Sequence, residues 1–229
     1  MLPERVPPVY SRAELRSDAL VHVAGILFAL VAAPVLVFLA VVWAGDAGTV
    51  SAMLVYAVCL LAMLVCSAIY NMVRWPDWRD SFRRLDQSAI YLKIAGTYTP
   101  FAVLTGAHAG PLLAGIWTAA LGGAALVLFG PARARRASFV FYVALGWAGA
   151  AIGGPLIEGL SGPGLALIVT GGVLYTAGIV FLLWERLPHH NTIWHVFVLA
   201  ATAILYAAVI VELRHGAGLY AAAAVPPFS

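Results

Sequence analysis

The sequence has little charge: only 10% of its 229 residues are Asp, Glu, Lys or Arg, whereas 63% are hydrophobic. Soluble domains have about 25% charged residues. With a mean hydropathy of +0.95, the chain would have too little polar surface to stay in water. Because about 20 apolar residues span a bilayer as a helix, this length predicts an integral membrane protein of about seven spans. We expect one domain over residues 1–229 and no separate soluble domain.

Other absences argue against a disulfide, a signal peptide and a nucleotide-binding motif. The two cysteines, Cys59 and Cys66, lie on one expected helix, roughly 10 Å apart along its axis, which is too far for a disulfide. The polar segment 1–18 is not followed by a short apolar core with a small-residue cleavage site, so no signal peptide is expected. The glycines lack the strand–loop–helix context of a nucleotide motif. The pI of about 9.0 comes from arginines in short loops, so no nucleic-acid partner is expected.

The apolar segments give the expected architecture. They predict transmembrane helices at about residues 19–44, 50–73, 86–105, 111–129, 138–157, 164–184 and 192–213. A weakly polar tail, 214–229, follows the last segment. Glycines are dense in the fourth to sixth segments, where small residues let helices pack closely. The expected fold class is therefore all-α, a seven-helix membrane bundle.

Arginines alternate between the loops, and this alternation predicts the orientation. The segment 1–18 and the loops 74–85, 131–137 and 185–191 contain most of the arginines, whereas the loops between them contain none. Because cytoplasmic loops carry an excess of Lys and Arg, we expect the N-terminus in the cytoplasm and the C-terminus outside. The chain is thus predicted to be a multi-pass protein of the cell (inner) membrane with membrane lipids as partners. The sequence leaves the oligomeric state open.

Two pairs of polar side chains share helix faces in otherwise very apolar segments. Ser67 and Asn71 are four residues apart, as are Asn191 and His195, so each pair lies on one side of its helix. Both pairs are near the predicted cytoplasmic ends of their spans, and Asp86 begins the third span from the same side. We therefore expect these five side chains to face one internal cavity open to the cytoplasm. The alternative is that each caps a helix or extends to water at the membrane surface.

Ionisable residues inside a membrane segment are costly, so they indicate function. Lys93 follows Asp86 by about two helical turns and lies on nearly the same face. Helical side chains lean toward the N-terminus, so Lys93 is expected to lean toward Asp86 and to pair with it. The alternative is a lysine bonded to backbone carbonyls or to water. Glu14 and His22 are further polar groups near the start of the first span.

Short motifs follow one another along most of the chain in a distinctive order. They are Glu14 with His22, Ser67-Ala-Ile-Tyr, Arg84-Leu-Asp-Gln-Ser-Ala-Ile-Tyr, Ile94-Ala-Gly-Thr-Tyr-Thr-Pro-Phe, Gly146-Trp147, Pro155-Leu156, Gly171-Gly172, Tyr175-Thr176, Gly178 and Ile193-Trp194-His195. In these motifs the chain resembles the hemolysin III family, the bacterial branch of the progestin and adipoQ receptor superfamily. The resemblance implies a seven-helix bundle with an intramembrane zinc site on the cytoplasmic side. Because the wider superfamily includes alkaline ceramidases, it also implies metal-dependent hydrolysis of a lipid amide.

The chain departs from the family pattern at the implied zinc site. The family has Ser-x-x-x-His in the second span and His-x-x-x-His in the seventh, where this chain has Ser67-x-x-x-Asn71 and Asn191-x-x-x-His195. His195 is retained, and Asn71 and Asn191 stand at the other two ligand positions. A catalytic zinc takes three protein ligands, and an asparagine oxygen suits harder cations. His190 is about 100° around the helix from Asn191 and should face elsewhere, so zinc is a candidate cofactor that the sequence does not favour.

Three functions are compatible with this pattern. The missing ligands favour a non-catalytic sensor or regulator of membrane state with a degenerate metal site, in which Lys93 supplies the charge of the absent metal. The alternative is an intramembrane zinc-dependent hydrolase acting on a lipid amide, with Ser67, Asp86, Lys93 and His195 as catalytic candidates. The third compatible function is that of a channel or transporter.

Overall fold

The computed structural model describes residues 10–73, 75–106 and 109–223, except for the side chains of 109, 132–137, 152 and 219–223. The described residues form eight α-helices and one 3-10 helix, without strands. These elements are α1 (Arg12–Trp43), α2 (Ala47–Met72), η1 (Pro76–Trp78), α3 (Arg79–Thr105), α4 (Ala109–Phe129), α5 (Ala132–Ile152), α6 (Gly154–Glu158), α7 (Gly162–Leu183) and α8 (His190–Ala223). The predicted all-α class is confirmed.

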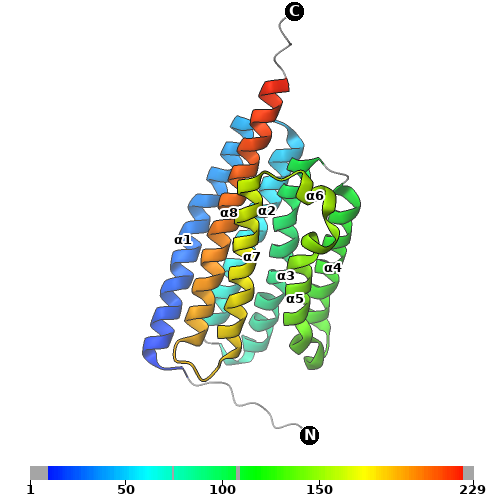
Figure 1. Cartoon of the computed structure of the whole chain (residues 1–229). Coiled ribbons are helices and arrows are strands. Elements are labelled where there is room, and N and C mark those ends of the chain that lie inside the picture. Colours follow the sequence, from blue (N-terminus) through cyan, green and yellow to red (C-terminus); the bar gives the residue numbers. More distant parts are fainter. Residues whose placement is uncertain (1–9, 74, 107–108, 224–229) are drawn as a thin grey trace, which may run out of the picture.

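The long helices run side by side in one elongated bundle (Figure 1). α3 is the central helix, because it contacts α2, α4, α5, α6 and α8. α1 packs against α2 and α8, and α7 packs mainly against α8. α1 begins at one end of the bundle and α8 finishes at the other (Figure 1). The starts of α1, α3 and α8 and the end of α2 therefore lie at the same end.

Five of these helices, α1, α2, α4, α7 and α8, are long and apolar enough to cross a membrane. α5 has a shorter apolar stretch, Ser138–Ala151. α3 contains Lys93 and several Thr and Tyr residues, and ten of its residues are buried among its neighbours. The number of crossings and the orientation of the termini stay predictions.

The helix boundaries correct the sequence prediction at several places. α3 begins at Arg79, inside the expected basic loop 74–85, so Asp86 lies about two turns into the helix and not at its start. α1 begins at Arg12, inside the expected polar segment, because the Ser11 hydroxyl accepts from the Glu14 N–H and the Glu14 carboxylate accepts from the Ser11 N–H, which is a capping box. The segment expected at 138–157 is two helices: α5 ends at Ile152 with Gly153 as its cap, and Pro155 lies in the first turn of α6, where its missing N–H costs nothing. α8 extends to Ala223, into the expected tail, where alanine favours helix.

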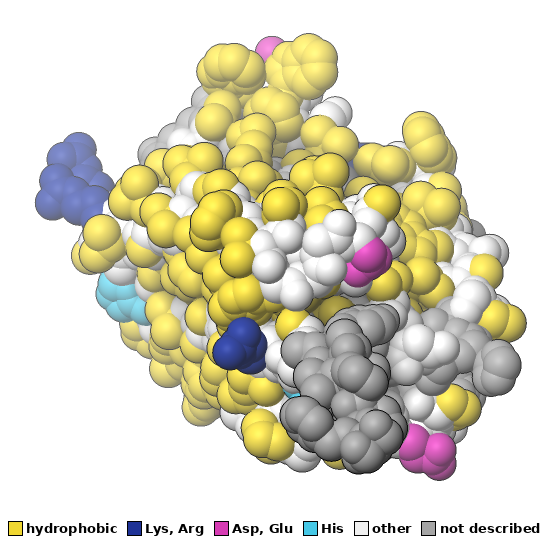
Figure 2. Space-filling model, turned by 90° about the horizontal axis from the view of Figure 1, so that it is seen from above, with side chains coloured by type: hydrophobic (Ala, Val, Ile, Leu, Met, Phe, Trp, Pro, Cys, Tyr) yellow, Lys and Arg dark blue, Asp and Glu magenta, His cyan; other side chains and the backbone are white. Residues whose placement is uncertain are grey.

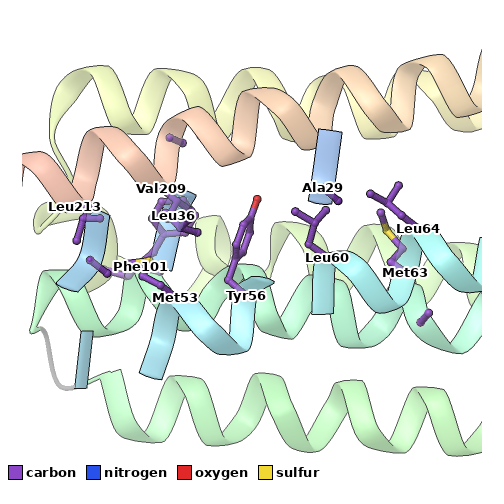
Figure 3. Packing of buried hydrophobic residues seen from close by; sticks show 14 residues of the cluster. Ala29, Leu36, Met53, Tyr56, Leu60, Met63, Leu64, Phe101, Val209 and Leu213 are labelled. Atoms are coloured by element: carbon purple, nitrogen blue, oxygen red, sulfur yellow. The ribbon is translucent and has the colours of Figure 1, made fainter. Parts of the chain in front are cut away.

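The core lies between α1, α2, α3 and α8. Figure 3 shows part of it, with Tyr56 and Leu60 of α2 facing Ala29 and Leu36 of α1 and Val209 of α8. Figure 2 looks along the bundle onto one end, where hydrophobic side chains outnumber charged ones. The sides of the helices are apolar as well, with large side chains such as Leu27, Phe38 and Val180 exposed. This is the surface that a helix bundle presents to lipid.

Two carboxylates cap helix starts at the end of the bundle opposite the start of α1. The Thr49 N–H donates to Asp46 Oδ1 over 2.8 Å at the start of α2, and this bond holds the pKa of the Asp46 carboxyl below its usual value. At the start of α7, the buried Glu212 accepts from the Ser161 hydroxyl (2.6 Å) and the Ser161 N–H (3.1 Å). A side chain at Gly164 would overlap the Glu212 carboxylate.

Gly164→Ala is therefore expected to destabilise the protein. The added methyl group pushes Glu212 away from Ser161, and the loss of hydrogen bonds to a buried carboxylate lowers the free energy of unfolding by about 1.5–3 kcal/mol. Thermal unfolding in detergent measures the change. Gly122→Ala in α4 is the matched control, because a Cβ there meets nothing within 4 Å. Equal melting temperatures for the two variants would contradict the prediction.

Candidate functional site

Polar side chains from α1, α2 and α8 meet near the end of the bundle where α1 begins. Asp18 and His22 come from one face of α1, four residues apart, and His195 comes from the second turn of α8. All three are at least nine-tenths buried, with exposed fractions of 7%, 4% and 8%. Ionisable groups buried so completely in a membrane bundle indicate a functional site.

Asp18 is the centre of this group. His195 Nδ1 is 2.6 Å from Asp18 Oδ1, and Asn191 Nδ2 donates to Asp18 Oδ2 over 3.2 Å. His22 Nε2 lies 3.4 Å from Asp18 Oδ2 without hydrogen-bond geometry. The rings of His22 and His195 are also in contact, with centroids 4.3 Å apart. The carboxylate thus lies against two imidazoles and one amide.

The two asparagines are joined to each other. Asn191 Nδ2 donates to Asn71 Oδ1 over 3.2 Å, and Asn71 Nδ2 donates to the Ser67 backbone oxygen over 2.9 Å. A chain of hydrogen bonds therefore runs from Asp18 on α1, through Asn191 on α8, to Asn71 on α2.

A cavity of about 80 Å³ lies beside this group. Its polar lining consists of His22, His195, Ser67, Asp86 and Tyr175, and its remaining walls are mostly apolar. Ser67 and Asp86 line the same cavity as the two histidines, and both histidines interact electrostatically with the Asp86 carboxylate. Since a buried water needs about 10–15 Å³ of such volume, there is room for several waters or a small reacting group. Asn71 and Asn191 are not among the lining residues.

Comparison with known proteins identifies the family. A sequence model of the family described as Haemolysin-III related matches residues 14–206, a range that includes every residue of this group. The chain belongs to the hemolysin III family. It is 39% identical over 199 residues to Hemolysin-3 of Bacillus cereus, which covers 85% of this chain and 89% of the relative. It is 34% identical over 198 residues to the Hemolysin-3 homolog of Bacillus subtilis (strain 168), with 85% and 92% covered.

A more distant relative belongs to the wider superfamily. The human Monocyte to macrophage differentiation factor is 28% identical over 165 residues, which are 68% of this chain and 67% of the relative. The predicted membership of the hemolysin III branch of the progestin and adipoQ receptor superfamily is thus confirmed, and with it the multi-pass membrane location.

The zinc site that the family implies does not fit the family positions in this hemolysin III protein. The amides of Asn71 and Asn191 are bonded to each other, to Asp18 and to Ser67. Asp18, His22 and His195 do fit, because one ligand atom from each lies within 4.8 Å of the others. His22 Nε2 is buried without a hydrogen-bond partner, and two histidines with one carboxylate are a known set of catalytic zinc ligands. These three side chains could hold a metal ion.

The sequence pattern did not single out Asp18, and it indicated His22 only as a further polar group near the start of the first span. Asp18 was assigned to the polar segment 1–18, although α1 begins at Arg12. The available signal was the spacing of four residues between Asp18 and His22, which places both on one helix face.

The pairing of Lys93 with Asp86 predicted from the sequence is wrong. The Lys93 amine donates to the Thr97 hydroxyl over 2.7 Å and lies 4.7 Å from the centre of the Tyr56 ring. Thr97 is one turn toward the C-terminal end of α3, whereas Asp86 is two turns the other way, so the amine points away from Asp86. Lys93 is buried, with 3% exposed, but it does not line the cavity.

The remaining candidates lie at the rim of the bundle. Glu14 caps α1 and accepts from the His189 N–H over 3.0 Å. His189 Nδ1 contacts the Ser17 hydroxyl at 2.9 Å, and His190 Nε2 is 3.4 Å from the Tyr10 hydroxyl. These groups join the α7–α8 loop to the start of α1 and are not among the residues that line the cavity.

Lys93→Met and Asp86→Asn are expected to have additive effects on stability. The two side chains share no partner and are separated by about 10 Å along α3, and distant substitutions usually add within about 0.5 kcal/mol. A double-mutant cycle on thermal unfolding measures the coupling. If the double variant recovered more than about 1 kcal/mol of the single losses, the two charges would be paired after all.

Proposed function

We propose that this hemolysin III protein is an intramembrane metal-dependent hydrolase. One observation carries the proposal. His22 Nε2 is buried without a hydrogen-bond partner and lies beside Asp18 and His195, next to a cavity that Ser67 and Asp86 also line. The ligand set would be Asp18, His22 and His195. This replaces the family positions 71 and 191 with two residues of α1.

The cavity groups have distinct tasks in such a reaction. A divalent metal held by Asp18, His22 and His195 would supply Lewis acidity and lower the pKa of a water in the cavity. Asp18 holds the His195 ring through its contact with Nδ1. Asp86 is the candidate general base and acid: it accepts a proton from water and returns it to the leaving group. The Ser67 hydroxyl lies in the same cavity lining as Asp86 and would orient the reacting water or the substrate.

The surroundings suggest the substrate class. The cavity walls away from the five polar side chains are formed by residues such as Met63, Leu64, Ile90 and Leu199, which favour a molecule with an apolar part. The bundle surface is apolar as well, so a molecule dissolved in the membrane reaches it most readily. A lipid amide, as in the ceramidases of the superfamily, is the substrate that we propose.

A second candidate is the non-catalytic sensor or regulator favoured by the sequence. It is supported by the hydrogen-bond chain from Asp18 through Asn191 to Asn71, which gives the carboxylate polar partners without any metal. In this case the site would be a buried polar network that stabilises the bundle and catalyses no reaction.

Metal content and turnover together test the proposal. The protein in lipid nanodiscs is analysed for bound zinc and other divalent metals and is assayed on a panel of lipid amides and esters. We expect near one metal per chain and measurable hydrolysis, with Asp86→Asn keeping the metal and losing turnover. Thr170→Val is the control, because Thr170 is exposed and bonds only within α7. Near-zero metal and no turnover would reject the hydrolase in favour of the regulator.

A further inference from the structure

We propose that Asn191 and Asn71 are positioning residues that hold Asp18 in the geometry of a metal ligand. This inference rests on the proposed metal site. It assigns a role to Asn71 and Asn191, the two residues that stand where the family pattern has zinc-ligand histidines.

The direction of each hydrogen bond in this chain of contacts is fixed. The Asp18 carboxylate and the Ser67 backbone oxygen can only accept. Asn191 must therefore turn its NH₂ group toward Asp18, and Asn71 must turn its NH₂ group toward Ser67. Asn71 then presents its oxygen to Asn191. Both hydrogens of the Asn191 amide are used, one on α1 and one on α2.

This arrangement fixes the rotation of the Asp18 carboxylate. Oδ1 contacts His195 and Oδ2 accepts from Asn191, so the plane of the carboxylate is held at both oxygens. His22 Nε2 is left at 3.4 Å from Oδ2 without a hydrogen bond. Ligating carboxylates are usually oriented by outer hydrogen bonds, and loss of such a bond typically lowers metal affinity about 10–100-fold.

The amide also solves an electrostatic problem. A neutral NH₂ group can donate to Asp18 without bringing a positive charge that would repel a metal cation. It brings no negative charge either, whereas a carboxylate at position 191 would repel Asp18 inside the bundle. Asparagine is thus suited to orienting a ligand carboxylate, although it is a poor zinc ligand itself.

The test compares metal binding in four proteins: the parent, Asn191→Leu, Asn71→Leu and Thr192→Val. Zinc dissociation constants are measured by competition with a chelator, and Co²⁺ absorption reports the ligand geometry. We expect Asn191→Leu to weaken zinc about 10–100-fold and to alter the Co²⁺ bands. Asn71→Leu should have a smaller effect in the same direction, since it acts only through Asn191. Thr192→Val is the matched control on α8, because Thr192 contacts Ser17 and not Asp18.

The outcomes separate this inference from the proposed function. If the parent binds zinc and Asn191→Leu binds it equally well, the positioning role is wrong and the metal site stands. If the parent binds no metal, both fail. A purely structural role would lower the melting temperature of the metal-free protein without changing zinc affinity, so that temperature is measured as well. Should Asn191→Leu fail to fold, Asn71→Leu decides: it removes the bond that holds the Asn191 amide from α2, and a zinc affinity equal to that of the parent would overturn the positioning role.

Discussion

Asp18→Asn should nearly abolish metal binding. The substitution removes the one charged ligand and leaves two imidazoles, whereas a catalytic zinc takes three protein ligands. We expect the zinc affinity to fall on the order of 100-fold or more, equivalent to about 3 kcal/mol. The amide oxygen at position 18 can still accept from Asn191, so the hydrogen-bond chain across α1, α8 and α2 need not collapse. Zinc content after purification and the dissociation constant by chelator competition measure the effect.

Asp86→Asn is the matched control for this change. It also removes one carboxylate from the cavity lining, but Asp86 is only half-buried and is not one of the three clustered ligands. Its zinc content should stay close to that of the parent. If the two variants lost zinc equally, the ligand set would be wrong and Asp86 would have to be included in it.

Asn71→His and Asn191→His, introduced together into the Asp18→Asn variant, should restore zinc binding. The Asn71 and Asn191 amides touch at 3.2 Å, and Asn191 shares a helix face with His195. Three imidazoles would therefore meet at the positions of the family pattern, as a catalytic zinc site requires. We expect a gain on the order of 100-fold over Asp18→Asn, equivalent to about 3 kcal/mol, measured as zinc stoichiometry and as a shift of the Co²⁺ absorption bands.

Lys93 enters this prediction as a correction. A Lys93 amine that leaned toward Asp86, as the sequence predicted, would oppose a restored zinc, and Lys93→Met would then be needed as a further change. Because the amine points toward Thr97 and Tyr56, the restored site should bind zinc with Lys93 present. Zinc binding that appeared only after Lys93→Met would show that the amine reaches the site.

The convergence of polar groups was accessible from the sequence for a simple reason. Helical spacing places Ser67 with Asn71 and Asn191 with His195, and alternating chain direction brings the end of α2 and the starts of α3 and α8 to one end of the bundle. Helix periodicity and span order suffice for that inference, and they also suffice for the all-α class.

The errors have equally specific causes. Hydropathy indicates where the membrane boundary lies but not where a helix begins. The capping box at Ser11 starts α1 at Arg12, so Asp18 lies within the helix and not in a polar segment before it. The direction of the Lys93 side chain depends on its rotamer and on neighbours such as Thr97, and helix spacing does not contain that information. The sequence predicts one continuous span across the break between α5 and α6, because the apolar pattern continues through Pro155.

The burial of Lys93 has a practical consequence. It is the chain's single lysine, so amine-reactive reagents that stay in water find no other lysine side chain to modify. With 3% of its surface exposed, Lys93 can react only when the helices around it separate. The rate of its acylation, read by mass spectrometry, therefore records how often the centre of the bundle opens, and no substitution is needed.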